Sequence, residues 1–238
     1  MEYIFFAGAN GSGKSTLIKN MRGLDEYQGF KYICADEAEK SLQDISDKNE
    51  RMKKARDMAL LLREDLLNNG ENIMFESVAS HKSHVEDLKA IKEMGYDITT
   101  IYVTTDNPNI NIERIKHRGR DNDTYLTPER VEGRYQRSLE LLAEFIKISN
   151  TVIAFDNSIN YVAVFSKTSR GVHCLLQEKE WAEKYIVEKL QKDGINIVKP
   201  SDLDEKSLQE IFNRVSSILN IETKTCQKSN DKDDDRSK

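Results

Sequence analysis

A glycine-rich turn near the N-terminus carries the most specific chemical signal in the sequence. Its residues are Gly8, Ala9, Asn10, Gly11, Ser12, Gly13, Lys14, Ser15 and Thr16. The first eight match the pattern G-x-x-x-x-G-K-[ST], with an apolar segment before them and a helical segment after them. In this pattern backbone N–H groups bind phosphates, Lys14 reaches the β- and γ-phosphates, and Ser15 ligates Mg²⁺. The turn therefore predicts a site for a nucleoside triphosphate such as ATP, together with Mg²⁺.

Two carboxylates stand where short apolar segments end. Asp36 follows the segment 32–35, and Glu76 follows the segment 72–75. The carboxyl ends of parallel strands face the ligand crevice, so both side chains are candidates for the site. Asp36 is the candidate for accepting the proton of an acceptor hydroxyl, and Glu76 for binding the acceptor or a metal-bound water. The alternatives are that Asp36 caps the helix after it and that Glu76 is an ordinary strand-end carboxylate.

Arginines recur at helical spacing on two predicted helices. They are Arg114 and Arg118 on the first helix, and Arg130, Arg134 and Arg137 on the second. The polar segment between the helices contains Arg120 and has the character of a lid over about residues 115–128. Arginines that flank a lid can close over phosphates and exclude water. The alternative for each arginine is an ordinary solvated side chain.

The remaining motifs narrow the functional class. No long apolar segment after the turn ends in the aspartate that usually supports Mg²⁺ in ATPases, and no Asn-Lys-x-Asp guanine signature occurs. A small-molecule kinase is therefore the leading class. His81 and His84 lack a third metal ligand in the sequence and are interpreted as surface residues, and Trp181 is interpreted as a core residue.

The elements that must position these side chains alternate between strand and helix. Apolar runs at 3–7, 32–35, 72–75, 97–104 and 151–155 predict strands, and helical spacing predicts helices at 14–22, 48–69, 83–94, 108–117 and 128–148. This alternation predicts a P-loop NTPase fold of the α/β class, with a five-stranded, mainly parallel sheet and helices on both faces. The kinase core is expected to span residues 1–158.

The pattern changes after residue 158. Segments 161–166 and 172–176 flank a polar turn and predict an antiparallel hairpin. Helices are expected at 178–192 and 203–219, so residues 159–222 form a C-terminal extension on the core. The polar residues 223–238 are expected to be a disordered tail.

Composition limits the partners and the compartment. The 36 basic and 41 acidic side chains give a net charge of −5, which disfavours nucleic acid as a partner. Cys34, Cys174 and Cys226 are few and far apart, as expected for reduced thiols in the cytoplasm. No segment approaches the roughly 20 apolar residues that a membrane span needs, so no membrane is expected to be involved.

An ordered set of motifs resembles the zeta-toxin-like P-loop kinases over about residues 3–185. The motifs are Phe5 to Thr16, Ala35-Asp36-Glu37, Phe75-Glu76-Ser77, Gly95-Tyr96, the run from Arg134 to Leu139, and Asp156-Asn157-Ser158. Where many relatives have a Gly-Gly-His stretch, this chain has Gly119-Arg120-Asp121.

The resemblance implies a kinase for a sugar hydroxyl, with UDP-N-acetylglucosamine as the acceptor of the type member, and an antitoxin protein as partner. It implies that Lys14 binds phosphate, that Ser15 ligates magnesium, and that Asp36 is the catalytic base. It also implies that Glu76 is an acceptor-site residue. Asp36, Ser77 and Arg120 are predicted to bind the acceptor together with Glu76. Arg118 and Arg134 carry over as phosphate-facing arginines.

Two other functions remain open at this level. One is a nucleotide-gated ATPase or regulatory binding module, whose hydrolysis serves only as a switch. The other is a kinase for a different hydroxyl, such as a polynucleotide 5′-hydroxyl, an antibiotic or a dinucleotide.

Overall fold

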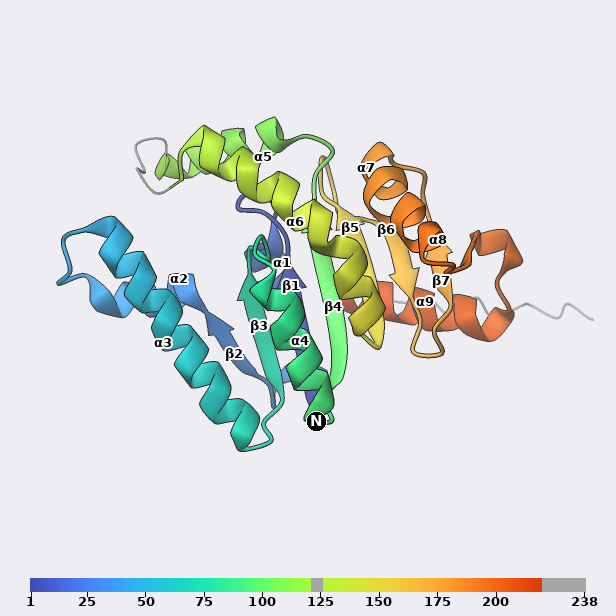
Figure 1. Ribbon diagram of the computed structural model, residues 1–238, viewed down its shortest axis with the longest axis horizontal. Helices are drawn as coiled ribbons and strands as arrows, with labels where there is room; N and C mark the ends of the chain where they lie inside the picture. The colour runs from blue at the N-terminus through green and yellow to red at the C-terminus, as the bar shows by residue number, and fades with distance from the viewer. Residues whose placement is uncertain (121–125, 220–238) are drawn as a thin grey trace, which may run out of the picture.

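The computed structural model describes residues 1–120 and 126–219, which form one eight-stranded sheet with helices on both faces (Figure 1). The strands are β1 (Glu2–Ala7), β2 (Lys31–Cys34), β3 (Ile73–Ser77), β4 (Asp97–Thr104), β5 (Thr151–Asp156), β6 (Val162–Lys167), β7 (His173–Leu175) and β8 (Ile197–Val198). Their order across the sheet is β2-β3-β1-β4-β5-β6-β7-β8. The first five strands are parallel, so the glycine-rich turn after β1 and the ends of β2 and β3 lie at the same edge.

Long helices connect the parallel strands. In chain order the helical elements are α1 (Lys14–Met21), η1 (Asp25–Tyr27), α2 (Ala35–Glu39), η2 (Lys40–Leu42), α3 (Lys48–Asn68), α4 (Ser83–Glu93), α5 (Pro108–Ile115), η3 (Lys116–Arg120), α6 (Pro128–Ile148), α7 (Glu180–Ala182), η4 (Glu183–Val187), α8 (Glu188–Lys192), η5 (Pro200–Asp202) and α9 (Glu205–Leu219). The predicted start of α6 is confirmed, because the Thr127 side chain accepts from the backbone N–H of Arg130 and Pro128 is the first helical residue. Within the described ranges, no helix combines the length and apolar character needed to cross a membrane.

The core lies on both faces of the sheet. Tyr3 and Phe5 of β1 belong to the apolar cluster on the face covered by α4 and α6, whereas Ile4 and Phe6 pack with α1 and α9 on the other face (Figure 1). Successive side chains of a strand point to opposite faces, so a strand covered on both sides must be apolar at every position. The continuous apolar run at residues 3–7 is thereby explained.

The predicted number of strands is wrong. The hairpin is confirmed as β6 and β7, but β6 pairs antiparallel with β5, and β7 pairs with the two-residue strand β8. The hairpin therefore extends the central sheet, which has eight strands instead of five. Pairing between strands uses backbone groups that every residue carries, so side-chain patterns do not reveal which edge a hairpin joins. The predicted boundary near residue 158 stays a prediction, and the predicted tail at 223–238 and Cys226 lie outside the described residues.

Candidate active site

The glycine-rich turn between β1 and α1 lies tightly against its neighbours. Gly11 has a φ of +78°, and a Cβ there would lie 2.5 Å from the carbonyl oxygen of Asn111. Gly13 has a φ of +110°, and a Cβ there would lie 2.2 Å from Nδ2 of Asn157. Both positions combine a left-handed backbone with a close approach, so only glycine fits without displacing its neighbours.

Side chains from outside the turn hold its carbonyl groups. Three donate hydrogen bonds of 2.8 Å to carbonyl oxygens of the turn: Asn111 to Asn10, Asn157 to Ser12, and Tyr161 to Gly13. These donors satisfy three carbonyl groups of the turn and fix its shape just before the N-terminus of α1, where backbone N–H groups favour an anion.

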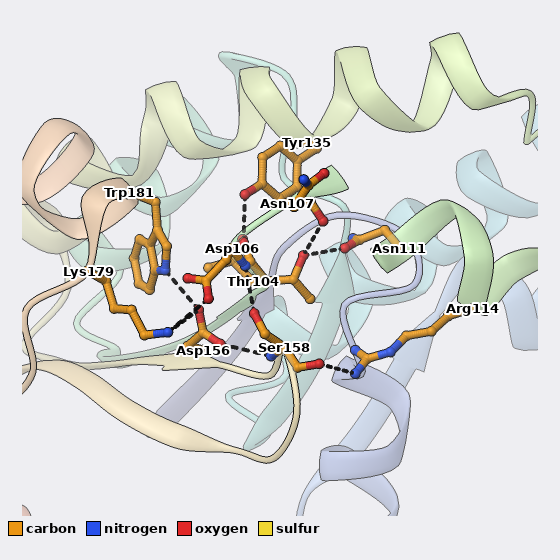
Figure 2. A network of polar contacts seen from close by, with 11 residues as sticks. Thr104, Asp106, Asn107, Asn111, Arg114, Tyr135, Asp156, Ser158, Lys179 and Trp181 are labelled. Atoms are coloured by element: carbon orange, nitrogen blue, oxygen red, sulfur yellow. Dashed lines mark hydrogen bonds and ion pairs between the residues drawn. The ribbon is translucent and has the colours of Figure 1, made fainter. Parts of the chain in front are cut away.

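The supports of the turn continue into a polar network at the ends of β4 and β5 (Figure 2). The Asp156 carboxylate accepts from the backbone N–H of Ser158 at 2.8 Å and from Nε1 of Trp181 at 3.0 Å, and Lys179 lies 3.7 Å away. Burial raises the pKa of Asp156, but hydrogen bonds from Ser158 and Trp181, among others, outweigh it and hold the pKa below its usual value. Trp181 is a core residue, as predicted, and its indole also ties the C-terminal segment to β5.

Lys14 and Ser15 lie at the start of α1, beside Glu76 of β3. The Lys14 ammonium donates to the carbonyl oxygen of Ala9 at 3.1 Å and lies 3.9 Å from Oε1 of Glu76. Ser15 Oγ donates to the same Oε1 at 2.9 Å. Burial lowers the pKa of Lys14, while the Glu76 and Asp36 carboxylates act in the opposite direction. A buried cation at the N-terminus of helix α1 suits an anionic ligand.

The oxygen atoms of Ser15 and Glu76 fit a magnesium ion that phosphates also ligate. Mg²⁺ prefers oxygen ligands and is commonly held by one or two protein groups together with substrate phosphates. No group of three or more His, Cys, Asp or Glu side chains in residues 1–120 and 126–219 could hold a metal by itself. The donor set therefore fits a metal that enters with a nucleotide.

Asp36 lines two neighbouring cavities. The smaller one, of about 40 Å³, is lined by Gly13, Lys14 and Ser15 of the turn, and the larger one, of about 580 Å³, extends toward α3 and the start of α4. Asp36, Glu76 and Lys14 line both. The N-cap position of α2 is Cys34, and Asp36 is an exposed residue in the first turn, so helix capping does not account for Asp36.

The larger cavity is lined by polar side chains whose proximity was not predicted from the sequence. Oγ of Ser77 lies 3.1 Å from Nε2 of His84, and both side chains line the cavity with Asp87. Burial lowers the pKa of His84 to about 4, although Asp87 favours the charged form, so the imidazole is neutral at physiological pH. The interpretation of His84 as a surface residue is wrong, because the end of β3 and the start of α4 fold it inward; His81 is exposed.

The predicted arginines divide into two groups. Arg118 lines the smaller cavity, and Arg134 and Arg137 line the larger one, with Nη1 of Arg134 donating to Oδ1 of Asn10 at 3.0 Å. Arg114 instead donates to the carbonyl oxygen of Ser158 at 3.2 Å, as Figure 2 shows, and Arg130 is exposed on α6 outside both cavities. The side chain of Arg120 and the central part of the predicted lid, 121–125, lie outside the described residues.

The sequence matches the AAA domain family over residues 4–136, which is more than half of the chain. The chain belongs to the AAA domain family. No curated protein shows significant sequence similarity to it.

Solved structures share the overall fold of this AAA domain protein. A chain from the PezAT chromosomal toxin–antitoxin system of Streptococcus pneumoniae is 15% identical, with a TM-score of 0.55, over 92% of this chain and 86% of that chain. The AvrRxo1-ORF1:AvrRxo1-ORF2 structure with sulphate ions gives a TM-score of 0.61 at 13% identity, over 92% of this chain and 76% of that chain. The structure of the same pair with ATP gives 0.59 at 13% identity, with the same coverage. These similarities confirm the predicted P-loop NTPase fold of the α/β class.

Several residues that contact this AAA domain site were not predicted from the sequence. Asn111 and Tyr161 support the turn, and Tyr32 contacts Glu76. Each lies in an ordinary helical, strand or loop pattern and reaches the site only through the arrangement of the sheet. Asn157 belongs to a motif that carried the family resemblance, but its hydrogen bond to Ser12 joins positions too far apart for spacing to predict.

Proposed function

We propose that this protein is an ATP-dependent kinase that transfers the γ-phosphoryl group to a hydroxyl of a small acceptor. The observation that carries the proposal is the position of Asp36, which lines both the cavity at Lys14 and the larger cavity. A carboxylate at this junction can meet an acceptor hydroxyl that arrives from the larger cavity.

The residues divide the task between binding and charge balance. Backbone N–H groups of the turn and the Lys14 ammonium bind the phosphates, and Ser15 with Glu76 holds Mg²⁺, which supplies neutralisation of phosphate charge when it is bound. Arg118 and Arg134, which approach the turn from η3 and α6, balance the charge on the transferring group.

The reaction forms one bond and breaks one bond. The acceptor oxygen bonds to the γ-phosphorus, and the bond from that phosphorus to the β–γ bridging oxygen breaks, which releases ADP. The hydroxyl proton passes to the Asp36 carboxylate. A weak base suffices here, because the proton leaves late in a loose transition state.

The larger cavity supports a nucleotide sugar such as UDP-N-acetylglucosamine as the acceptor. Its volume of about 580 Å³ is within the range of small-molecule sites. Leu60 and Phe75 offer apolar surface for rings, Arg56 and Arg137 offer charge for a diphosphate, and Ser77 with neutral His84 offers hydrogen bonds for hydroxyl groups. We further propose an antitoxin partner, on the basis of the fold shared with a chain from the PezAT toxin–antitoxin system.

A comparison of two neighbouring carboxylates tests the proposal. Asp36→Asn is expected to lower phosphoryl transfer by at least a hundredfold, the range of general acid–base catalysis, while ATP binding stays within a few-fold of wild type. Glu37→Gln is the matched control, since Glu37 lies on the same helix but faces Arg22 at 3.8 Å and lines neither cavity. Product is followed as phosphorylated metabolite by mass spectrometry with Mg-ATP and a panel of hydroxyl compounds.

The same measurement separates the kinase from a regulatory ATPase. A switch would hydrolyse ATP slowly without an acceptor and would be little affected by Asp36→Asn. Failure of wild-type protein to phosphorylate any compound in the panel, with no stimulation of ADP release, would overturn the kinase proposal.

A further inference from the structure

Two hydroxyl groups hold Glu76 from opposite sides. Ser15 Oγ donates to Oε1 at 2.9 Å, and Tyr32 Oη donates to Oε2 at 2.6 Å. Tyr32 lies on β2 and Glu76 on β3, where the residue paired with Glu76 is Cys34. Tyr32 and Glu76 are therefore diagonal neighbours on one face of the sheet, within reach of a long side chain.

Tyr32 is itself fixed in place. The Arg22 guanidinium lies 4.6 Å from the centre of the Tyr32 ring, a cation–π contact that joins the end of α1 to β2. The Tyr32 hydroxyl is the donor in its 2.6 Å contact with Oε2 of Glu76, because a carboxylate oxygen only accepts. The contact with Glu76 is thus a hydrogen bond from a neutral group to a charged acceptor, which is among the stronger types.

We propose that Tyr32 is a positioning residue that fixes Glu76 for magnesium binding beside Ser15. Lys14 Nζ lies only 3.9 Å from Oε1 of Glu76 and is its natural competitor for the carboxylate. Without the Tyr32 hydroxyl, the carboxylate is free to rotate and to pair closely with Lys14. That pairing would remove an oxygen ligand from the metal position and would occupy the ammonium that binds phosphate.

The inference rests on the proposed use of a nucleotide with Mg²⁺, and binding measurements test it. Tyr32→Phe removes one oxygen atom and leaves the ring under Arg22. With a fluorescent non-hydrolysable ATP analogue, we expect the Mg²⁺ concentration that gives half of the affinity enhancement to rise about tenfold, the equivalent of losing one hydrogen bond to a charged group. Binding without Mg²⁺ is expected to stay within about twofold of wild type.

Two further variants make the result specific. Tyr96→Phe is the matched control, because the Tyr96 hydroxyl donates to the carbonyl oxygens of Leu67 and Glu71 away from the site, and its Mg²⁺ midpoint should equal that of wild type. Glu76→Gln should raise the midpoint by itself, and adding Tyr32→Phe to it should change nothing more, because the hydroxyl acts through the carboxylate.

Three results would overturn the role of Tyr32. They are an unchanged Mg²⁺ midpoint in Tyr32→Phe, an equal loss of affinity with and without Mg²⁺, and a full effect of Tyr32→Phe in the Glu76→Gln background. Because the readout is binding, it decides the role of Tyr32 even if no phosphoryl transfer is found, so failure of the kinase proposal is distinguishable from failure of this one.

Discussion

The side-chain amide of Asn157 donates a 2.8 Å hydrogen bond to the carbonyl oxygen of Ser12, across 145 positions of sequence. Ser12 is fully buried, so water cannot replace this donor. The preceding residue, Asp156, accepts a hydrogen bond from Trp181, so the end of β5 joins the glycine-rich turn to helix α7 in the C-terminal part of the chain. The shape of the turn therefore depends on residues far from it in the chain.

Replacing Asn157 should lower nucleotide affinity by more than the accompanying loss of folding stability explains. Asn157→Ala leaves the Ser12 carbonyl without its donor, which should lower the free energy of unfolding by about 1–3 kcal/mol. It should also lower nucleotide affinity by about tenfold, because the turn is no longer held in shape. Asn150→Ala is the control, since Oδ1 of Asn150 accepts from the Ile98 N–H at the start of β4, and its variant should lose stability but bind nucleotide normally. Urea denaturation and nucleotide titration check both; equal nucleotide affinity in the two variants would contradict the prediction.

Gly13→Ala should abolish nucleotide binding. A methyl group at this position would lie 2.2 Å from Nδ2 of Asn157 and 2.7 Å from the Tyr161 hydroxyl, which are two of the groups that support the turn. Gly194→Ala is the control that measures the effect of backbone strain without crowding. Gly194 has a φ of +76° but nothing lies within 4 Å of the added methyl group. We expect Gly194→Ala to cost about 1–2 kcal/mol from strain alone and to retain nucleotide binding. Isothermal titration of both variants gives the comparison, and binding by Gly13→Ala at wild-type affinity would refute it.

Because His84 is neutral in the folded protein, the free energy of unfolding should decrease at acid pH. Burial lowers the pKa of His84 to about 4 from an ordinary value near 6.5, so the folded state binds this proton less readily than the unfolded state. The contribution of His84 to stability is complete above about pH 6.5 and is lost as the pH falls toward 4, by an amount on the order of 3 kcal/mol. His84→Gln should flatten this part of the profile, whereas the same change at exposed His81 should not. Denaturation midpoints between pH 7 and pH 4 test the prediction, and parallel profiles for His84→Gln and wild type would count against it.

Much of the fold was predictable because its signals are local. The apolar run before Gly8, the glycine pattern and the helical spacing after Lys14 predicted β1, the turn and α1, and the structure confirms them. Thr127 and Pro128 predicted the start of α6 through capping chemistry that involves only adjacent residues. The strand count was wrong because it depends on which backbone edge β6 meets, and no local pattern reports that.

The sequence by itself determined the glycine-rich turn, the parallel core around it and the candidate carboxylates Asp36 and Glu76, because motif, periodicity and strand ends are properties of neighbouring residues. Only the tertiary structure decided that Asp36 lines two cavities, that His84 turns inward, and that Tyr32 and Asn157 donate hydrogen bonds to groups of the site. These relationships join residues on different strands and helices. They arise when the sheet aligns the carboxyl ends of its parallel strands along one edge, so they exist only in the folded chain.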